Sequence, residues 1–122
     1  MMLARRHKNS PRPAWKIADA FAKWVRGWDC ACEGRNPYCS GKTVAAHVDY
    51  AGKGTPDAKG MGTKAADRWL VPFSVICHKM QHDLGWPEFE RRFLGGEGSA
   101  EKLAARLWQL WPGRRAWEAK HA

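Results

Sequence analysis

The segment "VICHKMQHDLG", Val75 to Gly85, carries His78 and His82 four residues apart, with Cys77 directly before the first of them. On an α-helix, residues at positions i and i+4 project from one face, so the two imidazoles can share one divalent cation. The histidine pair alone is weak evidence of a metal site, because the same spacing also arises by chance on ordinary helix surfaces. The residues between them lack the glutamate of an HExxH motif, which disfavours a zincin-type protease.

A third histidine, His47, lies in "VAAHVDY", at the expected end of a strand and before a loop rich in glycine and lysine. Two predicted strands lead from His47 back to the His78 helix. A β-hairpin packed on that helix would bring His47 over the face that carries His78 and His82. An imidazole that takes a proton from water, opposite a cation that stabilises charge on a phosphate, suits phosphodiester hydrolysis.

Local patterns predict the elements that must position these histidines. Helical periodicity, with glycine and proline at the ends, predicts helices over 13–27, 78–84, 86–94 and 99–111. β-Branched residues predict strands over 42–48 and 68–76. Ser99 is the expected N-cap of the last helix, Pro112 is expected to stop it, and the tail beyond is expected to be frayed. The loop over 49–67 is unusually long for a compact domain, which favours a functional role.

The composition narrows the class of protein. A chain of 122 residues fits one domain, here 13–122, preceded by a flexible basic arm over 1–12. Lysine and arginine outnumber aspartate and glutamate by 21 to 12, which favours a nucleic acid or an anionic surface as partner over a merely soluble basic protein. The eight tryptophans are expected mostly in the core, although one or two could stack on bases.

The chain shows no feature of a membrane or secreted protein. No apolar run approaches the ~20 residues that span a bilayer, and the N-terminal stretch lacks a signal-peptide core. We therefore expect no membrane partner and a cytoplasmic location. There, the four cysteines are expected to be reduced thiols or metal ligands.

The stretch "AAHVDY…GMGTKAADRWLVPFSVICHKMQH" resembles the HNH, or ββα-metal, nuclease superfamily. More specifically, it resembles small phage and prophage proteins related to the recombination-enhancement nucleases, which carry an AH pair, a GMGxK loop, a D-R-x-x-VPLC segment and a terminal HxxxH. The resemblance covers about Val25 to Phe93. It implies an α+β fold: a ββα-metal core over about 28–93, with a β-hairpin and a metal-binding helix, flanked by N- and C-terminal α-helices.

The resemblance implies a role for each histidine. His47 would be the general base, and His78 and His82 would bind the catalytic divalent metal, Mg²⁺ or Mn²⁺, with Zn²⁺ as a further candidate. The middle Asn of HNH has no clear equivalent. Asp67 is the nearest candidate, either to orient His47 or to bind metal, and Asp49 is a second candidate for that role.

Two departures from the family pattern concern metal ligands. Ala46 stands where many relatives carry an acidic residue directly before the base, and Ser74 replaces the cysteine of VPLC. The resemblance also implies a structural Zn²⁺ at the base of the hairpin, with free buried thiols as the alternative. The candidate ligands are Cys30, Cys32, Cys39 and Cys77. The C-x-C spacing of the first two is atypical, which leaves one of them as a candidate bystander.

The glycine-rich loop offers cations for phosphate contacts, with a solvated surface loop as the alternative. The candidate DNA-binding residues are Lys53, Lys59, Lys64 and Arg68.

These expectations describe a metal-dependent DNA endonuclease of HNH type and of phage or prophage origin. The alternatives are a non-catalytic zinc-containing DNA-binding or recombination-accessory protein, and a protein-interaction module that uses the Trp108 and Trp111 helix. Because relatives require a recombinase, a recombinase filament is a candidate partner besides DNA.

Overall fold

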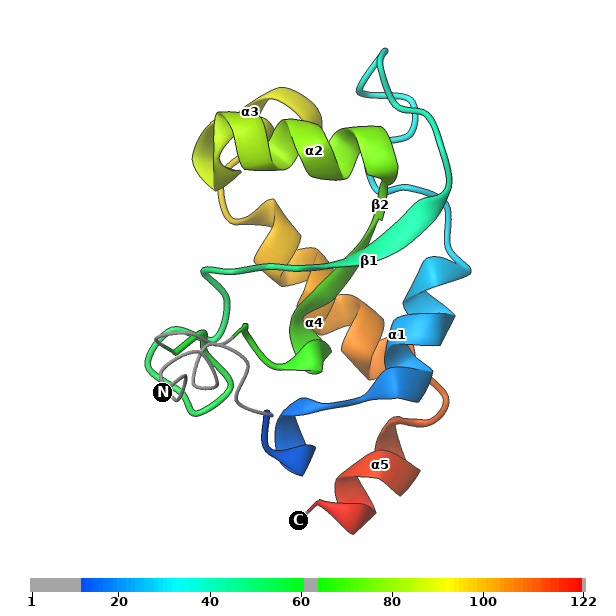
Figure 1. The fold of residues 1–122 in the computed structure, drawn as a ribbon, viewed down its shortest axis with the longest axis vertical. Helices are drawn as coiled ribbons and strands as arrows, with labels where there is room; N and C mark the ends of the chain where they lie inside the picture. The colour runs from blue at the N-terminus through cyan, green and yellow to red at the C-terminus, as the bar shows by residue number, and fades with distance from the viewer. Residues whose placement is uncertain (1–11, 61–63, 122) are drawn as a thin grey trace, which may run out of the picture.

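The computed structural model describes residues 12–60 and 64–121, which form an α+β architecture (Figure 1). Most of the expected N-terminal arm, residues 1–11, and residues 61–63 of the GMGTK motif lie outside the described residues. In chain order the elements are η2 (Ala14–Lys16), α1 (Asp19–Arg26), β1 (Thr43–His47), η3 (Asp67–Trp69), β2 (Leu70–Ser74), α2 (Val75–Leu84), α3 (Trp86–Phe93), α4 (Ser99–Leu110) and α5 (Arg114–Lys120), where η denotes a short 3₁₀ helix.

The two strands pair antiparallel, as the sequence predicts, with His47 opposite Leu70 and Ala45 opposite Pro72. Pro72 has no N–H to donate, and a sheet of two strands tolerates it because each strand is also an edge. The Pro72 carbonyl accepts a hydrogen bond from the Ala31 amide at 2.9 Å. This bond joins the cysteine-rich segment to the sheet.

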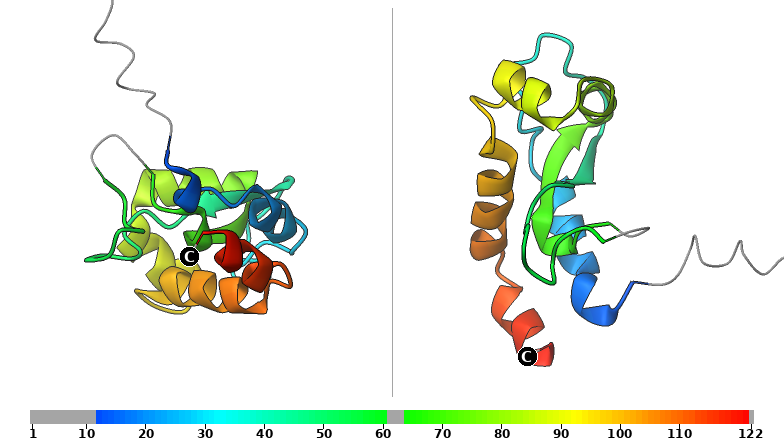
Figure 2. Two further views of the ribbon diagram at one scale, coloured as in Figure 1. Left: turned by 90° about the horizontal axis from the view of Figure 1, so that it is seen from below. Right: turned by 90° about the vertical axis from the view of Figure 1, so that its left-hand side faces the viewer.

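Helices cover the hairpin from three directions. α1 and α4 both pack against the sheet and meet through Phe21 and Trp108, whose ring centroids are 5.0 Å apart, and α2 crosses the end at which β2 finishes (Figures 1 and 2). α3 lies beside α2, and α5 follows α4 at the opposite end of the molecule (Figure 2). Within the described ranges, no helix is long and apolar enough to cross a bilayer.

Two buried clusters hold these layers together. The first lies among the cysteine-rich segment, the sheet, α3 and the start of α4, with Cys32, Phe73, Cys77, Phe89 and Ala100 fully buried. The second lies among α1, α4 and β2. Its members are Ala18, Phe21, Val25, Leu70, Leu107, Trp108 and Trp111. Most of the tryptophans contribute to one cluster or the other, as expected, whereas Trp15 and Trp28 are exposed.

The start of α2 lies earlier in the chain than predicted, and β2 is correspondingly shorter. The Ser74 side chain accepts a hydrogen bond from the Cys77 amide at 3.1 Å, so it caps a helix that begins at Val75. At the other end of the strand, residues 68–69 belong to η3. Gly85, with φ of 84°, ends α2 at the predicted residue.

The helix predicted over 13–27 is divided into η2 and α1. Ile17 is extended (φ −105°, ψ 125°), and its carbonyl accepts a hydrogen bond from Trp117 Nε1 at 3.1 Å. The Ala18 amide donates to Asp67 Oδ2 at 2.8 Å. Because both backbone groups bond to residues far along the chain, the helical ladder is interrupted and α1 begins at Asp19.

The N-terminus of α4 is capped by Glu90 rather than by the predicted Ser99. The Glu90 carboxylate is 2% exposed and accepts hydrogen bonds from the amides of Gly98 and Ala100, at 3.0 and 2.9 Å, and from the Tyr50 hydroxyl. The Ser99 hydroxyl instead donates to a backbone carbonyl at 2.6 Å. A buried carboxylate at this position compensates the unpaired amides of the first helical turn.

The tail after Pro112 is not frayed, contrary to the sequence expectation. It forms α5, whose Trp117 ring lies edge-on to Trp108 with the centroids 5.3 Å apart. Arg114 and Glu118 form an i,i+4 ion pair at 2.9 Å on the same helix. Packing of one aromatic ring therefore orders a short helix whose local sequence is strongly polar.

Candidate functional site

The three candidate histidines line one small cavity. His47 comes from the end of β1, whereas His78 and His82 come from α2, and all three border a cavity of about 140 Å³. The hairpin and the helix pack against each other, so residues more than thirty positions apart in the sequence share one site. Asp49 and Lys64, from the two ends of the long loop, complete its polar lining.

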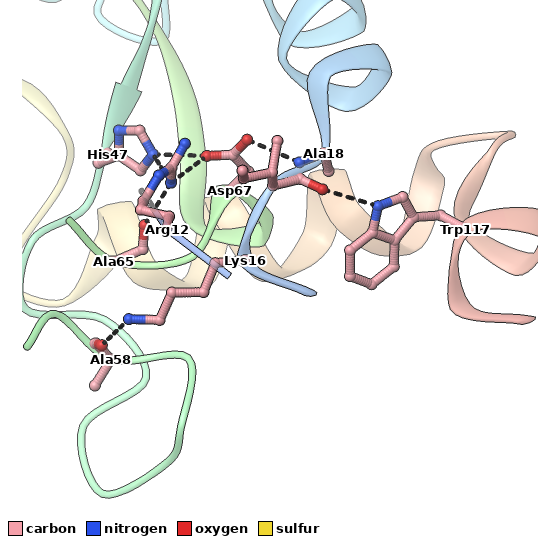
Figure 3. Close-up of polar contacts among 9 residues, drawn as sticks. Arg12, Lys16, Ala18, His47, Ala58, Ala65, Asp67 and Trp117 are labelled. Carbon is pink, nitrogen blue, oxygen red and sulfur yellow. Dashed lines mark hydrogen bonds and ion pairs between the residues drawn. The ribbon is translucent and has the colours of Figure 1, made fainter. Parts of the chain in front are cut away.

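His47 is held by Asp67. The Nε2 atom of His47 lies 2.9 Å from Asp67 Oδ1 (Figure 3), and an ionised carboxylate can only accept, so this nitrogen carries the proton. The second ring nitrogen, Nδ1, then holds a lone pair in the neutral ring. Figure 3 shows this nitrogen turned away from Asp67. The side chain of His47 is 16% exposed, which leaves it accessible from the cavity.

Asp67 is itself fixed by two further donors. The Arg12 guanidinium donates to Oδ1 at 2.8 Å, and the Ala18 amide donates to Oδ2 at 2.8 Å (Figure 3). Burial by itself would raise the pKa of Asp67, but the hydrogen bonds from His47, Ala18 and Arg12 outweigh it and lower the pKa to about 2. At neutral pH, Asp67 is therefore an ionised acceptor placed to orient the imidazole, which is one of the two roles that the sequence suggests for it.

The buried carboxylate of Asp67 predicts a loss of stability in acid. Because its pKa falls from 3.8 to about 2 on folding, ionised Asp67 contributes roughly 2 kcal/mol above pH 4, which is lost as the pH falls to 2. Thermal unfolding of the wild type and of Asp67→Asn, measured from pH 7 to pH 2, checks this. The stability gap between the two should be constant above pH 5 and should narrow below pH 4; parallel curves throughout would contradict it.

His78 and His82 point toward each other on one face of α2. Their Nε2 atoms are 3.2 Å apart, so two nitrogen donors converge at a single point. Burial, followed by the proximity of His82, lowers the pKa of His78 and favours the neutral imidazole that binds metals. The donor chemistry therefore fits a divalent cation, and imidazole nitrogen favours a transition-metal ion over Mg²⁺.

The two candidate aspartates occupy different places. Asp67 contacts His47, whereas Asp49 borders the same cavity as His78 and His82. The negative charge of Asp49 opposes the lowering of the His78 pKa, which places its carboxylate within electrostatic reach of that imidazole. The sequence treats the two as rivals for one position, but their surroundings suit them to separate tasks. Asp67 can orient the base, and Asp49 can supply charge to a bound cation.

A second group of possible metal ligands lies at the base of the hairpin. The sulfur atoms of Cys30, Cys32 and Cys77 lie within 4.8 Å of one another and are buried. Both members of the C-x-C pair therefore belong to the cluster, so neither is set aside as a bystander. Among the described residues, this is the only group of three or more side chains whose donor atoms gather this closely.

Cys39 lies at the edge of the cluster. Its thiol is 3.5 Å from Ser74 Oγ and interacts with the thiols of Cys30 and Cys77. Hydrogen bonding from Cys32 lowers the pKa of Cys30 to about 4, whereas burial raises the pKa of Cys39 to about 11. The cluster thus favours negative charge on one sulfur, and the thiols of Cys30, Cys32 and Cys77 lie close enough together to bind one metal ion.

The four cations proposed for DNA binding are distributed over different surfaces. Lys64 borders the histidine cavity, whereas Lys53 and Lys59 are exposed on the loop and do not line it. Arg68 points elsewhere: its guanidinium lies 5.3 Å from the Trp69 ring centroid and pairs with Asp57 at 3.4 Å. The structure therefore brings one of the four beside the histidines.

Arg12 is the residue that sequence reasoning missed. One of its nitrogens, Nη1, lies 2.8 Å from Asp67 Oδ1 and 3.4 Å from His47 Nε2, and it also donates to the Ala65 carbonyl. In the sequence it ends a basic, proline-containing stretch and resembles the other arginines there. It lies 55 positions before Asp67 in the sequence, so no local signal identifies it.

No protein-family model, curated protein or solved structure matches this chain.

Proposed function

We propose that the protein is a metal-dependent DNA endonuclease of HNH type, built on a ββα-metal core formed by β1, β2 and α2. The observation that carries the proposal is the shared cavity of His47, His78 and His82, with His47 fixed through Nε2 by Asp67. One candidate base and two candidate ligands thus face the same small volume from different elements. The excess of positive charge, +9 in total, supports an anionic polymer as substrate.

In this mechanism His47 acts as general base. Asp67 accepts the Nε2 proton, so Nδ1 remains free to remove a proton from the attacking water. The ionised Asp67 then stabilises the imidazolium that forms, because the pair stays in hydrogen-bond contact at 2.9 Å. Arg12 keeps Asp67 in place from the other side, at 2.8 Å.

His78 and His82 would hold the divalent cation, with Asp49 on the same cavity wall. When bound, such a cation supplies Lewis-acid stabilisation of the charge that develops on the phosphate and on the leaving oxygen. Lys64, on the rim of the cavity, is placed to contact a phosphate oxygen. We expect these contacts to go to the phosphate backbone, with little sequence preference and strong salt dependence.

The cysteine cluster has a separate, structural role in this proposal. The clustered Cys30, Cys32 and Cys77, with Cys39 proposed as the fourth ligand, would bind Zn²⁺ between the segment before β1 and the first turn of α2. A metal at that point would stabilise the start of the helix that carries both catalytic ligands. Origin in a phage or prophage and dependence on a recombinase filament rest on the sequence resemblance alone.

A non-catalytic DNA-binding role is the second candidate, and one observation favours it. Among the described residues, the group of three or more clustered metal donors is the cysteine one, so the histidine cavity offers two converging donors and a more distant carboxylate. If the catalytic ion is bound only weakly, the protein would bind DNA without cutting it. Cleavage assays separate the two candidates, whereas DNA affinity does not.

Metal-dependent nicking tests the proposal. Supercoiled plasmid incubated with the purified protein should be converted to nicked and linear forms with Mn²⁺, more slowly with Mg²⁺, and not at all with EDTA. His78→Ala should remove this activity, whereas Lys79→Ala, an exposed neighbour on the same helix, should keep it. DNA binding without nicking under every metal condition, with and without a recombinase filament, would reject the nuclease in favour of the binding protein.

A further inference from the structure

A second cavity lies next to the histidine site, on the other side of Asp67. It has a volume of about 270 Å³, and its lining includes Ala66 and Arg68, the two sequence neighbours of Asp67. Ala18, whose amide holds the Asp67 carboxylate, lines it as well. The candidate general base His47 is therefore separated from this cavity by little more than the buried side chain of Asp67.

Aromatic rings form much of this cavity. Trp15, which is 39% exposed, lines it together with Trp108 and Trp117. Trp117 stacks with His121 at a centroid separation of 4.1 Å and an interplanar angle of 18°. Flat apolar walls in a space below the ~300 Å³ of drug-sized sites suit a single planar heterocycle.

The polar groups of the cavity include both donors and acceptors. The Arg68 guanidinium lies 5.5 Å from the Trp108 ring centroid, and its Nε is buried with no hydrogen-bond partner. The carboxylates of Asp57 and Glu118 also line the space, where Asp57 accepts from Arg68 at 3.4 Å and Glu118 accepts from Arg114 at 2.9 Å, and each keeps further lone pairs. An unsatisfied buried donor beside carboxylate acceptors is an environment that a nucleobase edge can complete, since base edges present acceptors and amino donors together.

The backbone of residues 16–18 connects the cavity to the catalytic candidate. Figure 3 shows the Ala18 amide directed at Asp67. One residue earlier, the Ile17 carbonyl accepts a hydrogen bond from Trp117 Nε1 at 3.1 Å. The same short segment thus positions both His47, through Asp67, and an aromatic wall of the cavity. Lys16, which also lines the cavity, directs its ammonium to the Ala58 carbonyl at 3.1 Å (Figure 3).

We propose that this cavity binds one unpaired base of the DNA substrate, so that the protein acts on single-stranded or locally unpaired DNA. The inference rests on the proposed nuclease function and names its substrate class. A base inside a duplex is stacked on both faces and cannot enter this cavity and reach its aromatic walls without unstacking. Aromatic stacking is tolerant of sequence, as expected for a protein that otherwise contacts the phosphate backbone.

Binding measurements on three probes of equal length test this inference. The probes are a labelled oligothymidylate of about 12 nucleotides, an abasic strand with the same phosphates, and the corresponding duplex, without added divalent metal. The oligothymidylate should bind about tenfold more tightly than the abasic strand, because stacking of one base has an effect of that order. Trp15→Ala should remove this preference, whereas Trp28→Ala, an equally exposed tryptophan outside the cavity, should keep it.

The outcomes separate this inference from the proposed function. Equal affinity for the oligothymidylate and the abasic strand, or a preference that survives Trp15→Ala in the folded protein, overturns the base site even if plasmid is nicked. A base-dependent affinity removed by Trp15→Ala supports the base site even if no strand is cut, in which case only the nuclease assignment fails. Tighter binding to the duplex than to either single strand also overturns the inference.

Discussion

Replacing His47 by alanine is expected to abolish metal-dependent DNA cleavage while the protein stays folded and still binds its divalent ion. The imidazole contributes the proton-accepting Nδ1, and general bases of this kind accelerate reactions by ~10²–10⁴-fold. The ligands His78 and His82 lie on a different element and keep their own mutual contact at 3.2 Å. Nicking rates and Mn²⁺ affinity, measured on the same preparations, check both halves of this expectation.

A matched variant on the same strand provides the control. Thr43 is four residues before His47, on the same face of β1, and does not line the histidine cavity. Thr43→Ala should therefore keep both cleavage and metal affinity. If His47→Ala loses Mn²⁺ binding together with cleavage, His47 is a metal ligand and its assignment as base is wrong.

Replacing Cys32 by serine is expected to remove one bound Zn²⁺ per chain and to destabilise the fold. Cys32 is fully buried within the cluster that also contains Cys30 and Cys77. Loss of a structural metal is among the few changes that cost more than about 4 kcal/mol, which corresponds to a fall in Tm of about 15 °C for a domain of this size. Metal analysis and thermal unfolding measure the two effects.

A chelator distinguishes a zinc site from ordinary buried thiols. If zinc binds the cluster, treatment of the wild type with a strong chelator should lower its Tm by nearly as much as Cys32→Ser does, and the chelator should barely affect the variant. Buried free thiols predict the opposite pattern, in which the chelator leaves the wild type unchanged and the variant carries only the cost of a hydroxyl in the core. That pattern would reject the structural zinc.

The local features of the chain could be predicted well from the sequence. The helix that carries His78 and His82 follows from their spacing and from Gly85, which takes a positive φ where the helix ends. The antiparallel pairing of the two strands follows from their β-branched residues and from the chain that joins them. These are interactions among neighbours in the sequence, for which periodicity and terminal residues carry the information.

The boundaries that failed are those where a distant residue competes with a local hydrogen bond. The first helix is broken at Ile17 and Ala18 because Trp117 and Asp67 take their backbone groups, across 100 and 49 positions. The C-terminal tail is helical because Trp117 packs on Trp108. Neither the polar sequence of the C-terminal tail nor the amphipathic pattern of the first helix indicates these distant partners.

The candidate site divides in the same way. The types and spacing of the residues were sufficient to nominate His47, His78 and His82, because the chemistry of an imidazole is a property of the side chain itself. Only the tertiary structure decided that Asp67, rather than Asp49, contacts His47, and that Arg12 stabilises this contact. Hydrogen bonds between residues 20 and 55 positions apart depend on how the hairpin closes, and that closure is determined by packing throughout the fold.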